Sequence, residues 1–525
     1  GAAVMAEEPA CCVVSVSRPA DASEAAAGPW SCSGVVLSRS PGLVLCQGAV
    51  FAPFLRDGRD AWAQPHTLRP DALRSCPRLL VLLPPARTYS PVLGLDAPAT
   101  SCSTASGLQQ HEARLLALVP CGPFQQALLC AFGQADQWHF GGDAAADGDE
   151  DDLRSLHWFA WLRVPGLDSV SGGWMPRASA RGLRKGEGLL ACGSPFGALC
   201  PDLFLNTLSR GVVSNLAGEG NALVLTDARC LPGTEGGGAF LPSPAGPRLV
   251  AVIAASFCWK GAEWVGLTLL CSLDAILCSS TGVLDEAGVV MLPSVPGAAA
   301  QAGNRQDHLG WTALVECGAA WGSGVLLDPR LLLTCRHVVE AGAPLRVTLV
   351  PDPSRAATVL GGRVVFATEE SSPFDVAVVE LEESVPGFVS PRPANTFLPG
   401  EEVSVVGFGS LGCACGPSVT TGVLSAVVGV AGRPVMLQTT CAVHGGSSGG
   451  PLISSRSGCL LGIVASNTRD TSVGATYPHL NFCIPITVLQ PLIMRYRRTG
   501  DPAVFTRLNR AGGRVRAAWR LQRQP

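Results

Sequence analysis

Short runs of Val, Leu and Ala, separated by glycine and proline, dominate the chain, and long stretches with helical periodicity are scarce. Runs of this length between turn-forming residues predict β-strands, and many of them at short spacing predict an all-β fold. The pattern is most regular between residues 308 and 494, where it predicts two successive groups of six strands. The first group is 312–317, 324–327, 331–334, 345–350, 357–367 and 375–381, and the second is 402–407, 420–428, 435–439, 451–454, 460–466 and 480–484.

The chain changes character after these strands. Thr487 is a suitable N-cap for a helix in which proline is tolerated in the first turn. The helix would bury an apolar stripe made of Leu489, Leu492, Ile493 and Tyr496. Beyond Met494 the chain carries nine arginines against one aspartate, which predicts that residues 495–525 form a solvated basic tail.

Composition narrows the classes of protein that fit this pattern. A chain of 525 residues with 47% hydrophobic and 15% charged residues is long enough for several domains, or for two large all-β domains. A net charge of −3 argues against a nucleic-acid binder that relies on bulk electrostatics. The sequence contains no uninterrupted apolar run of 18 residues, so we expect no transmembrane segment. The 21 cysteines lack paired spacing, which predicts buried thiols in a reducing compartment and no structural metal.

Three polar residues stand at strand ends in the second half of the chain. His337 follows the strand 331–334, Asp375 opens the strand 375–381, and Ser448 lies in the glycine-rich turn 445–450. A serine hydroxyl becomes nucleophilic when a base takes its proton. Histidine titrates near neutral pH, and an aspartate can hold its imidazole in the required tautomer. The set therefore predicts a catalytic triad that needs no cofactor, and Gly446 allows the backbone shape of an oxyanion hole.

The order His, Asp, Ser within a pattern of two β-barrels distinguishes this triad from those of subtilisin and the α/β-hydrolases. Segments 322–325, 334–338, 374–378 and 446–452 resemble the chymotrypsin clan of serine proteases, and segments 420–425 and 462–467 are similar to its HtrA/Deg branch. This resemblance implies that His337 is the base, Asp375 its partner and Ser448 the nucleophile. It also implies that the N–H groups of Gly446 and Ser448 form the oxyanion hole.

Two departures from the clan's pattern bear on specificity and activation. Ser447 stands where trypsinogen-type zymogens carry the aspartate that binds a new N-terminus, so that activation route is unavailable. Ala442 stands where trypsin-like enzymes carry the aspartate that binds Arg or Lys. A specificity pocket that accepts a small or apolar residue is therefore expected.

The front half of the chain repeats the order of segments seen in the back half. Segments 33–37, 43–46, 158–162, 193–197, 208–214 and 226–237 echo 323–327, 332–335, 375–379, 407–412, 420–425 and 439–450. In this pairing Gly48 replaces His337, Trp158 replaces Asp375, and Glu235 (or Gly236, after a one-residue slip) replaces Ser448. The repeat predicts two chymotrypsin-like double β-barrel modules in tandem, followed by a C-terminal helix. Residues 1–285 would be a degenerate regulatory or substrate-binding module, 286–308 a linker, and 309–494 the active protease.

The layout is similar to the peroxisomal leader-peptide-processing protease family, because a long front region precedes the protease and no PDZ domain follows it. This resemblance implies a peroxisomal matrix endopeptidase that removes targeting leaders from imported enzymes, notably those of fatty-acid β-oxidation. It also implies cleavage next to cysteine and self-processing. Self-association is a separate expectation for the partners of this chain. The small polar segment 99–107 makes Cys102 the candidate self-cleavage residue. The last residues, 520–525, do not form the Ser-Lys-Leu-type signal of the family, so the peroxisomal interpretation rests on the resemblance and on cysteine usage.

Other functions remain compatible with parts of this pattern. A general Deg-like quality-control protease would carry the same triad. A scaffold that only binds polypeptide would fit the front half, and an esterase would fit the triad alone. A complete triad favours an enzyme, and a strand near Ser466 that can pair with an extended peptide favours a polypeptide substrate.

Overall fold

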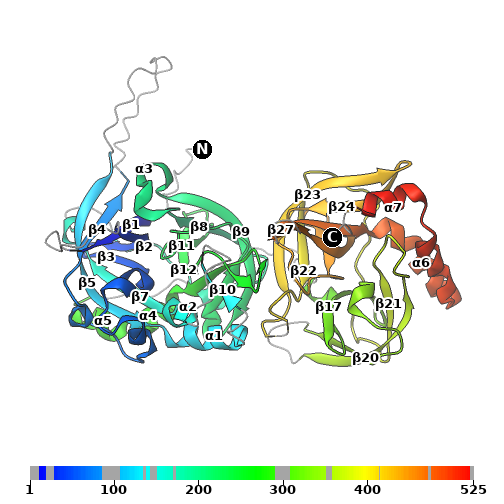
Figure 1. The fold of residues 1–525 in the computed structure, drawn as a ribbon, viewed down its shortest axis with the longest axis horizontal. Helices are drawn as coiled ribbons and strands as arrows, with labels where there is room; N and C mark the ends of the chain where they lie inside the picture. The colour runs from blue at the N-terminus through cyan, green and yellow to red at the C-terminus, as the bar shows by residue number, and fades with distance from the viewer. Residues whose placement is uncertain are drawn as a thin grey trace, which may run out of the picture.

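The computed structural model describes residues 11–18, 29–84, 107–133, 138–141, 151–168, 173–289, 308–350, 357–412, 414–470 and 475–520. Strands dominate these residues and close into barrels, as the short apolar runs predicted (Figure 1). We call residues 11–289 the front module and residues 308–520 the rear module.

The front module contains two six-stranded antiparallel barrels. Strands of the first barrel follow the order β1-β2-β3-β7-β5-β4 around the barrel, and those of the second the order β8-β9-β10-β15-β12-β11. The first barrel consists of β1 (Cys11–Ser17), β2 (Trp30–Arg39), β3 (Gly42–Gln47), β4 (Arg78–Leu83), β5 (Gln109–Pro120) and β7 (Trp158–Arg163). The second consists of β8 (Gly188–Gly193), β9 (Thr207–Ala217), β10 (Leu223–Thr226), β11 (Gly238–Leu241), β12 (Arg248–Ala255) and β15 (Thr268–Ser272).

The rear module repeats this topology strand for strand. Its barrels follow the orders β16-β17-β18-β21-β20-β19 and β22-β23-β24-β27-β26-β25. The first consists of β16 (Thr312–Cys317), β17 (Ala320–Asp328), β18 (Leu331–Thr334), β19 (Leu345–Leu349), β20 (Thr358–Ala367) and β21 (Ala377–Leu381). The second consists of β22 (Glu402–Gly407), β23 (Ser418–Val430), β24 (Arg433–Thr439), β25 (Pro451–Ser454), β26 (Leu460–Asp470) and β27 (Ala475–Pro485). The predicted tandem of double-barrel modules is therefore confirmed, and each predicted rear strand overlaps an observed one.

Short helices and a small sheet complete the front module. Its helices are α1 (Gly122–Phe132), α2 (Asp151–Leu156), α3 (Pro201–Phe204), α4 (Leu273–Ser279) and α5 (Thr281–Glu286). The small sheet has the order β14-β13-β6 and consists of β6 (Trp138–His139), β13 (Trp259–Lys260) and β14 (Glu263–Trp264). The predicted linker 286–308 falls mostly outside the described residues, which resume at His308.

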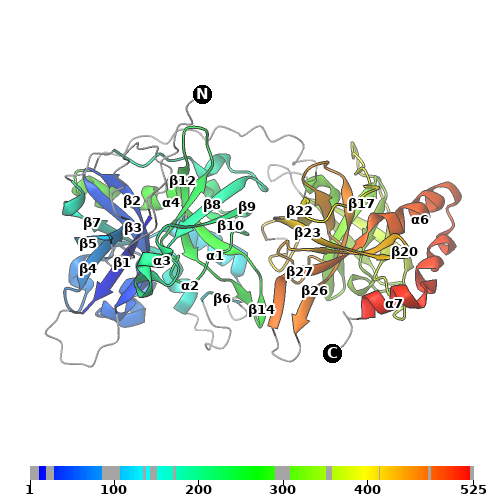
Figure 2. The same ribbon diagram turned by 90° about the horizontal axis from the view of Figure 1, so that it is seen from above.

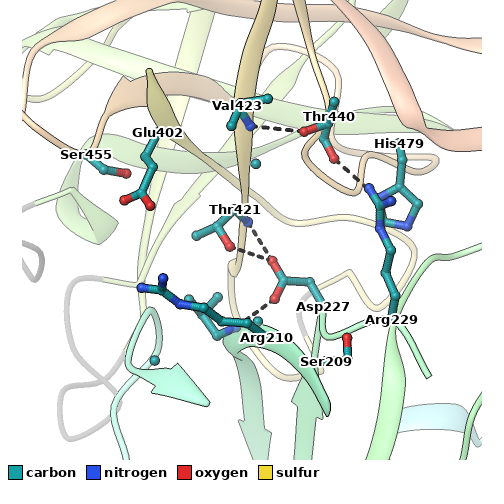
Figure 3. Close-up of a pocket in the computed structure, with 14 residues that line it drawn as sticks. Ser209, Arg210, Asp227, Arg229, Glu402, Thr421, Val423, Thr440, Ser455 and His479 are labelled. Carbon is teal, nitrogen blue, oxygen red and sulfur yellow. Dashed lines mark hydrogen bonds between the residues drawn. The ribbon is translucent and has the colours of Figure 1, made fainter. Parts of the chain in front are cut away.

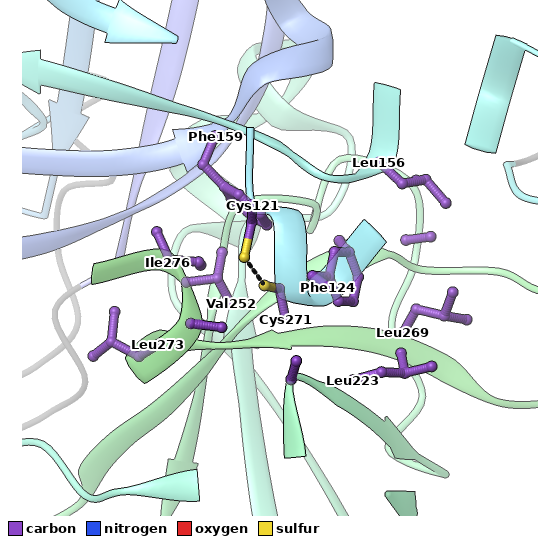
Figure 4. Packing of buried hydrophobic residues seen from close by; sticks show 14 of the residues in the cluster. Cys121, Phe124, Leu156, Phe159, Leu223, Val252, Leu269, Cys271, Leu273 and Ile276 are labelled. Carbon is purple, nitrogen blue, oxygen red and sulfur yellow. Dashed lines mark hydrogen bonds between the residues drawn. The ribbon is translucent and has the colours of Figure 1, made fainter. Parts of the chain in front are cut away.

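One apolar cluster joins the two barrels of the front module. Helix α1 packs across the end of the second barrel (Figure 4). The ring centroid of its Phe124 lies 6.3 Å from that of Phe159 in β7 of the first barrel. The thiols of Cys121 and Cys271 lie 3.7 Å apart in this cluster. The cysteines in the described residues are free thiols and most of them are buried, so they serve as small apolar residues in the core.

The C-terminal segment differs from the sequence-based expectation of a solvated tail. The predicted helix is α6 (Ile486–Thr499), with Leu489, Leu492 and Ile493 buried, and it begins one residue before Thr487. Beyond it, a 3-10 helix (Pro502–Arg510) and α7 (Gly513–Arg520) return to the rear module. Trp519 is buried and its Nε1 donates to the Val435 carbonyl at 3.0 Å. The two segments are amphipathic, since the charged ends of their arginines point to water while Phe505 and Trp519 pack inward. The high arginine content concealed this pattern in the sequence.

The two modules lie side by side, with β9 of the front module against β23 of the rear module (Figures 1 and 2). Asp227 of the front module accepts hydrogen bonds from the Thr421 N–H at 2.6 Å and from its Oγ1 at 3.0 Å (Figure 3). The half-buried Lys185 donates to the carbonyls of Cys415 and Pro417 at 2.7 and 2.8 Å. Buried polar contacts of this kind fix the relative orientation of the modules, because breaking them would leave charged groups unpaired.

None of the helices in the described residues combines the length and the apolar character that a membrane span requires.

Candidate active site

His337 lies in a single turn of 3-10 helix that directly follows β18. Its Nδ1 lies 2.5 Å from Oδ2 of Asp375, and its backbone N–H donates to Oδ1 of the same carboxylate at 3.1 Å. The two contacts fix both the ring and the backbone of His337 against one aspartate. The ring is 46% exposed, which leaves its other nitrogen accessible from the solvent side.

Asp375 lies two residues before β21, in the junction between the barrels, and its side chain is 21% exposed. Burial by itself would raise the pKa of this carboxyl, but the hydrogen bonds and the nearby charge of His337, together with Arg336, hold the pKa below its ordinary value. The carboxylate therefore stays ionised at neutral pH, as a group that stabilises an imidazolium must.

Ser448 lies in the turn between β24 and β25, and hydrogen bonds on both sides of it fix the backbone. Its carbonyl accepts from the Ser323 N–H at 2.8 Å, and the N–H of the next residue, Gly449, donates to the Val464 carbonyl at 2.7 Å. Gly449 has φ of +87°, and a β-carbon added there would lie 2.1 Å from the Ser323 carbonyl. Only glycine fits this position, and the tight turn places Ser448 at its apex.

The histidine and serine segments meet at Gly322 in β17. A β-carbon added to Gly322 would lie 2.6 Å from Cγ2 of Val338 and 3.2 Å from the carbonyl oxygen of Ser448. Within the described residues the Ser448 hydroxyl makes no hydrogen bond to the His337 ring. Hydrogen bonds between nucleophile and base commonly tighten only when substrate binds, so the arrangement is compatible with catalysis.

Gly446 has the geometry of an oxyanion-hole residue. Its φ is +89°, and a β-carbon added there would lie 2.2 Å from the ring of Trp321. Its carbonyl accepts from the Ser323 hydroxyl at 2.8 Å, and the same oxygen of Ser323 accepts from the Phe408 N–H at 2.8 Å. Among the described residues, the N–H groups of Gly446 and Ser448 have no hydrogen-bond acceptor. They are available to a developing oxyanion.

Ala442 is buried on the loop that precedes Ser448, next to residues of both modules. Its carbonyl accepts from the Thr420 hydroxyl at 2.8 Å, and a β-carbon added to Gly266 of the front module would lie 3.3 Å from its own β-carbon. Nearby, burial lowers the pKa of His444 to about 4, and its Nδ1 accepts from the Ser410 N–H at 2.8 Å. His444 is therefore a neutral structural residue at physiological pH.

Cys335, His337 and Asp375 offer ligand atoms within 4.8 Å of one another, which raises the question of a metal site. Cys335 is fully buried and its thiol donates to the Val464 carbonyl at 3.2 Å. Burial raises the pKa of this thiol well above its ordinary value. A metal would need the thiolate, which this environment disfavours. The carboxylate of Asp375 is therefore better suited to orienting the His337 ring and stabilising its imidazolium form than to binding a metal.

The front module repeats the hydrogen bonds of the serine turn around Glu235. The Ser33 N–H donates to the Glu235 carbonyl at 2.9 Å, as the Ser323 N–H does to that of Ser448. Gly233 and Gly236 have φ of +93° and +85°, and they correspond to Gly446 and Gly449. Glu235 is therefore the structural counterpart of Ser448, and the alternative register with Gly236 in that place is wrong.

The carboxylate of Glu235 fills the place where the front module would have its oxyanion hole. Oε2 accepts from the Gly233 N–H at 2.8 Å, and Oε1 accepts from the Ser256 N–H at 3.2 Å and also contacts the Ser256 hydroxyl. A carboxylate is not a hydroxyl nucleophile, and here it occupies the amide that an oxyanion would need. The front site is chemically closed.

The strand register corrects one further assignment in the front module. Ser38 pairs with Leu43 in the β2–β3 hairpin, whereas Asp328 pairs with Leu331 in its rear counterpart, so the front turn is two residues longer. Ala49, not Gly48, therefore takes the place of His337. The place of Asp375 is taken by Trp158, as predicted, because Ala160 pairs with Cys46 of β3 as Ala377 pairs with Thr334 of β18, and each residue in question lies two positions earlier.

Sequence reasoning missed two residues that hold the serine turn. Ser323 was visible only as part of a repeated Ser-Gly-Val segment, and that repetition with Ser33 was a usable signal. Glu263 of β14 accepts from the Gly445 N–H at 2.9 Å, and no local pattern indicated this contact. The candidate self-cleavage residue Cys102 lies outside the described residues.

Comparisons with known proteins agree with this geometry. The model of the trypsin-like peptidase domain matches residues 322–463. The peroxisomal leader peptide-processing protease of Mus musculus is 51% identical over all of this chain and 97% of the relative, and that of Homo sapiens is 49% identical over the same shares. The putative serine protease HhoB of a Synechocystis species is 33% identical over 32% of this chain and 38% of the relative.

Proposed function

This chain belongs to the peroxisomal leader peptide-processing protease family and is a serine endopeptidase of the trypsin and HtrA type, and from that premise we propose that it removes targeting leaders from imported peroxisomal matrix enzymes. The observation that carries the catalytic part of the proposal is the contact between His337 and the ionised Asp375. It lies at the edge of a turn that presents Ser448 and two N–H groups without an acceptor in the described part of the chain.

The proposed reaction proceeds through an acyl-enzyme. His337 takes the proton of the Ser448 hydroxyl as its oxygen attacks the scissile carbonyl, and Asp375 stabilises the imidazolium. The N–H groups of Gly446 and Ser448 bind the oxyanion. The C–N bond then breaks, and His337 returns its proton to the leaving amine. A water molecule, deprotonated by His337, hydrolyses the ester in the same way and frees Ser448. No cofactor takes part.

The substrate class follows from the family and from the pocket. The relatives are named for processing leader peptides in peroxisomes, and enzymes of fatty-acid β-oxidation are the substrates we propose here. Ala442 supports a small uncharged residue, such as cysteine, before the cut, because the loop offers no carboxylate to pair with Arg or Lys. Strand β26 supports a polypeptide substrate, since an extended chain can add to its edge.

Location, self-processing and domain roles complete the proposal. We place the protein in the peroxisomal matrix, as its relatives' names suggest, and assign catalysis to residues 309–494. Residues 1–285, which include most of the front module, regulate that site instead of cleaving, and the closed Glu235 site supports this role. Self-cleavage after Cys102 would nick the front module between β4 and β5.

Self-association has support from one exposed apolar surface. Phe196, Leu199, Leu203 and Leu208, around α3 of the front module, are 45%, 79%, 76% and 51% exposed. Apolar patches of this kind mark contact sites between proteins. Replacing Leu203 with Glu should lower the sedimentation coefficient if a second copy covers this surface, and an unchanged coefficient would remove that support.

The experiment that tests the function compares the wild-type chain with Ser448→Ala. Each is incubated with a leader-bearing peroxisomal precursor and with a mature control lacking the leader, and products are identified by intact mass. Wild type should release the leader, and Ser448→Ala should not. Cleavage of both precursor and control would favour a general Deg-like quality-control protease, and no cleavage with retained precursor binding would favour a polypeptide-binding scaffold.

A further inference from the structure

A hairpin of the front module reaches the active-site loops of the rear module. Strands β13 and β14 form the hairpin that connects β12 to β15 along the chain, and β14 packs against β27 of the rear module (Figure 2). Lys260 on β13 donates to the Ser410 carbonyl at 3.1 Å, and the ring of Trp264 on β14 meets His479 edge-to-face at 5.5 Å.

Glu263, at the start of β14, joins two segments of the rear site through one oxygen atom. Its Oε1 accepts from the N–H of Gly445 at 2.9 Å and from Nδ2 of Asn467 at 3.2 Å. Gly445 directly precedes the oxyanion-hole glycine, Gly446. Asn467 lies on β26, the strand that we propose pairs with substrate. One side chain of the front module therefore links the loop that stabilises charge to the strand that holds the peptide.

The Gly445–Gly446 segment needs such a contact. Two consecutive glycines have an unusually wide choice of backbone conformations, so ordering them costs more conformational entropy than ordering other residues. Gly445 is exposed, and the nearest atoms to a β-carbon added there would be those of the Glu263 carboxylate and the Ser410 hydroxyl. Ser447 occupies the position of the aspartate through which trypsin-type enzymes order this loop.

The peptide unit that carries the Gly446 N–H is held through the two peptide units that flank it, and its own carbonyl, that of Gly445, accepts from the Ser410 hydroxyl at 3.3 Å. On one side Glu263 accepts from the Gly445 N–H, and on the other the Ser323 hydroxyl donates to the Gly446 carbonyl at 2.8 Å. A hydrogen bond to a charged carboxylate is stronger than one between neutral groups. Together they leave the Gly446 N–H with no acceptor among the residues that the structure describes, and so available to an oxyanion.

The closed site of the front module shows what happens when a carboxylate binds the loop N–H one residue later, at the oxyanion-hole glycine. There the carboxylate of Glu235 links Gly233 to Ser256, which correspond to Gly446 and Asn467, and so it occupies the oxyanion-hole amide itself. In the rear module the carboxylate comes from the other module and binds one residue earlier in the loop. The same type of link therefore closes one site and leaves the other open.

We propose that Glu263 is a positioning residue through which the front module holds the oxyanion hole of the rear module in its working shape. This inference rests on the proposed function, because it assigns a role to the N–H of Gly446 in catalysis. It gives the degenerate module a definite role, since the protease site is complete only when the β13–β14 hairpin is docked.

The test measures the rate at which a fluorophosphonate labels Ser448 in the full chain, together with kcat and KM for a peptide substrate. For Glu263→Ala we expect labelling and kcat to fall about 10- to 100-fold, since an oxyanion-hole donor loses its fixed position. Glu263→Gln should stay within about threefold of wild type, because the amide oxygen can still accept from both Gly445 and Asn467. Glu219→Ala, an exposed change elsewhere in the front module, is the matched control and should leave the rate unchanged.

The outcomes separate this inference from the proposed function. Labelling of wild type but not of Ser448→Ala supports the function, and a wild type that does not label overturns the function itself. With a labelled wild type, a Glu263→Ala chain that labels at the wild-type rate overturns the inference. Equal losses in Glu263→Ala and Glu263→Gln also overturn it, because the acceptor oxygen would then not be what matters.

Discussion

Ser323 offers the sharpest test of how the serine turn is held, because the duplication supplies its own control. The buried hydroxyl of Ser323 donates to the Gly446 carbonyl and accepts from the Phe408 N–H, both at 2.8 Å. In the front module the hydroxyl of Ser33 donates to the Gly233 carbonyl and accepts from the Ser194 N–H, both at 2.7 Å. The two serines make the same contacts in modules of which only one is proposed to react.

Replacing either serine with alanine leaves a buried N–H and a partly buried carbonyl without their partner. A buried donor that loses its acceptor costs about 1–3 kcal/mol, and water can rehydrate the more accessible carbonyl. We expect each variant to lose about 2 kcal/mol of stability. For a module of this size that corresponds to a thermal midpoint about 4–8 °C lower, measured by calorimetry or near-UV circular dichroism.

Activity should separate the two variants. Ser323→Ala frees the Gly446 carbonyl, so the neighbouring N–H loses its orientation and fluorophosphonate labelling of Ser448 should slow about tenfold or more. Ser33→Ala should label at the wild-type rate, although it destabilises its own module to a similar degree. Equal labelling rates for Ser323→Ala and wild type would refute the reasoning, as would an equal loss in both variants.

Four further predictions follow from the geometry of the sites. Asp375→Asn should lower kcat about 10⁴-fold at pH 7 with little change in KM, since the histidine would lose the carboxylate that sets its tautomer; a retained kcat would contradict the assignment. Gly446→Ala should abolish labelling, because the new methyl group would lie 2.2 Å from the Trp321 ring on a backbone with φ of +89°, and the loop would have to move. Steady-state labelling checks the loss, and a melting curve checks that the chain still folds. In a Ser448→Ala background, Glu235→Ser should remain unlabelled by fluorophosphonate, because Ala49 supplies no base, and a labelled peptide containing residue 235 would disprove the degeneracy. Burial lowers the pKa of Lys185 from 10.5 to about 8, whereas the unfolded chain keeps this proton up to about pH 10.5. The free energy of unfolding should therefore rise with pH between 8 and 10.5. Lys185→Met should remove that rise in denaturant titrations.

Local patterns in the sequence were enough to predict the barrels and the candidate triad. Alternating short apolar runs report strand positions directly, because a strand buries side chains with a period of two and ends at residues that favour turns. His337, Asp375 and Ser448 each lie at such an end, so their order along the chain indicated the fold type before any contact was known. The substitution of Glu235 for Ser448 was visible for the same reason, since the glycines around it repeat.

What only the tertiary structure decided involves residues that are distant in sequence. A hairpin turn two residues longer moved the counterpart of His337 from Gly48 to Ala49, and turn length is invisible to a comparison of strand segments. The basic C-terminal segment packs inward because Phe505 and Trp519 join the apolar core of the rear module, where Val435 also gives Trp519 a carbonyl acceptor. Glu263 and Gly445 are 182 residues apart, and their contact exists because two modules dock side by side. Periodicity and spacing describe one element at a time, whereas the shape of this oxyanion hole depends on which surfaces of two folded modules meet.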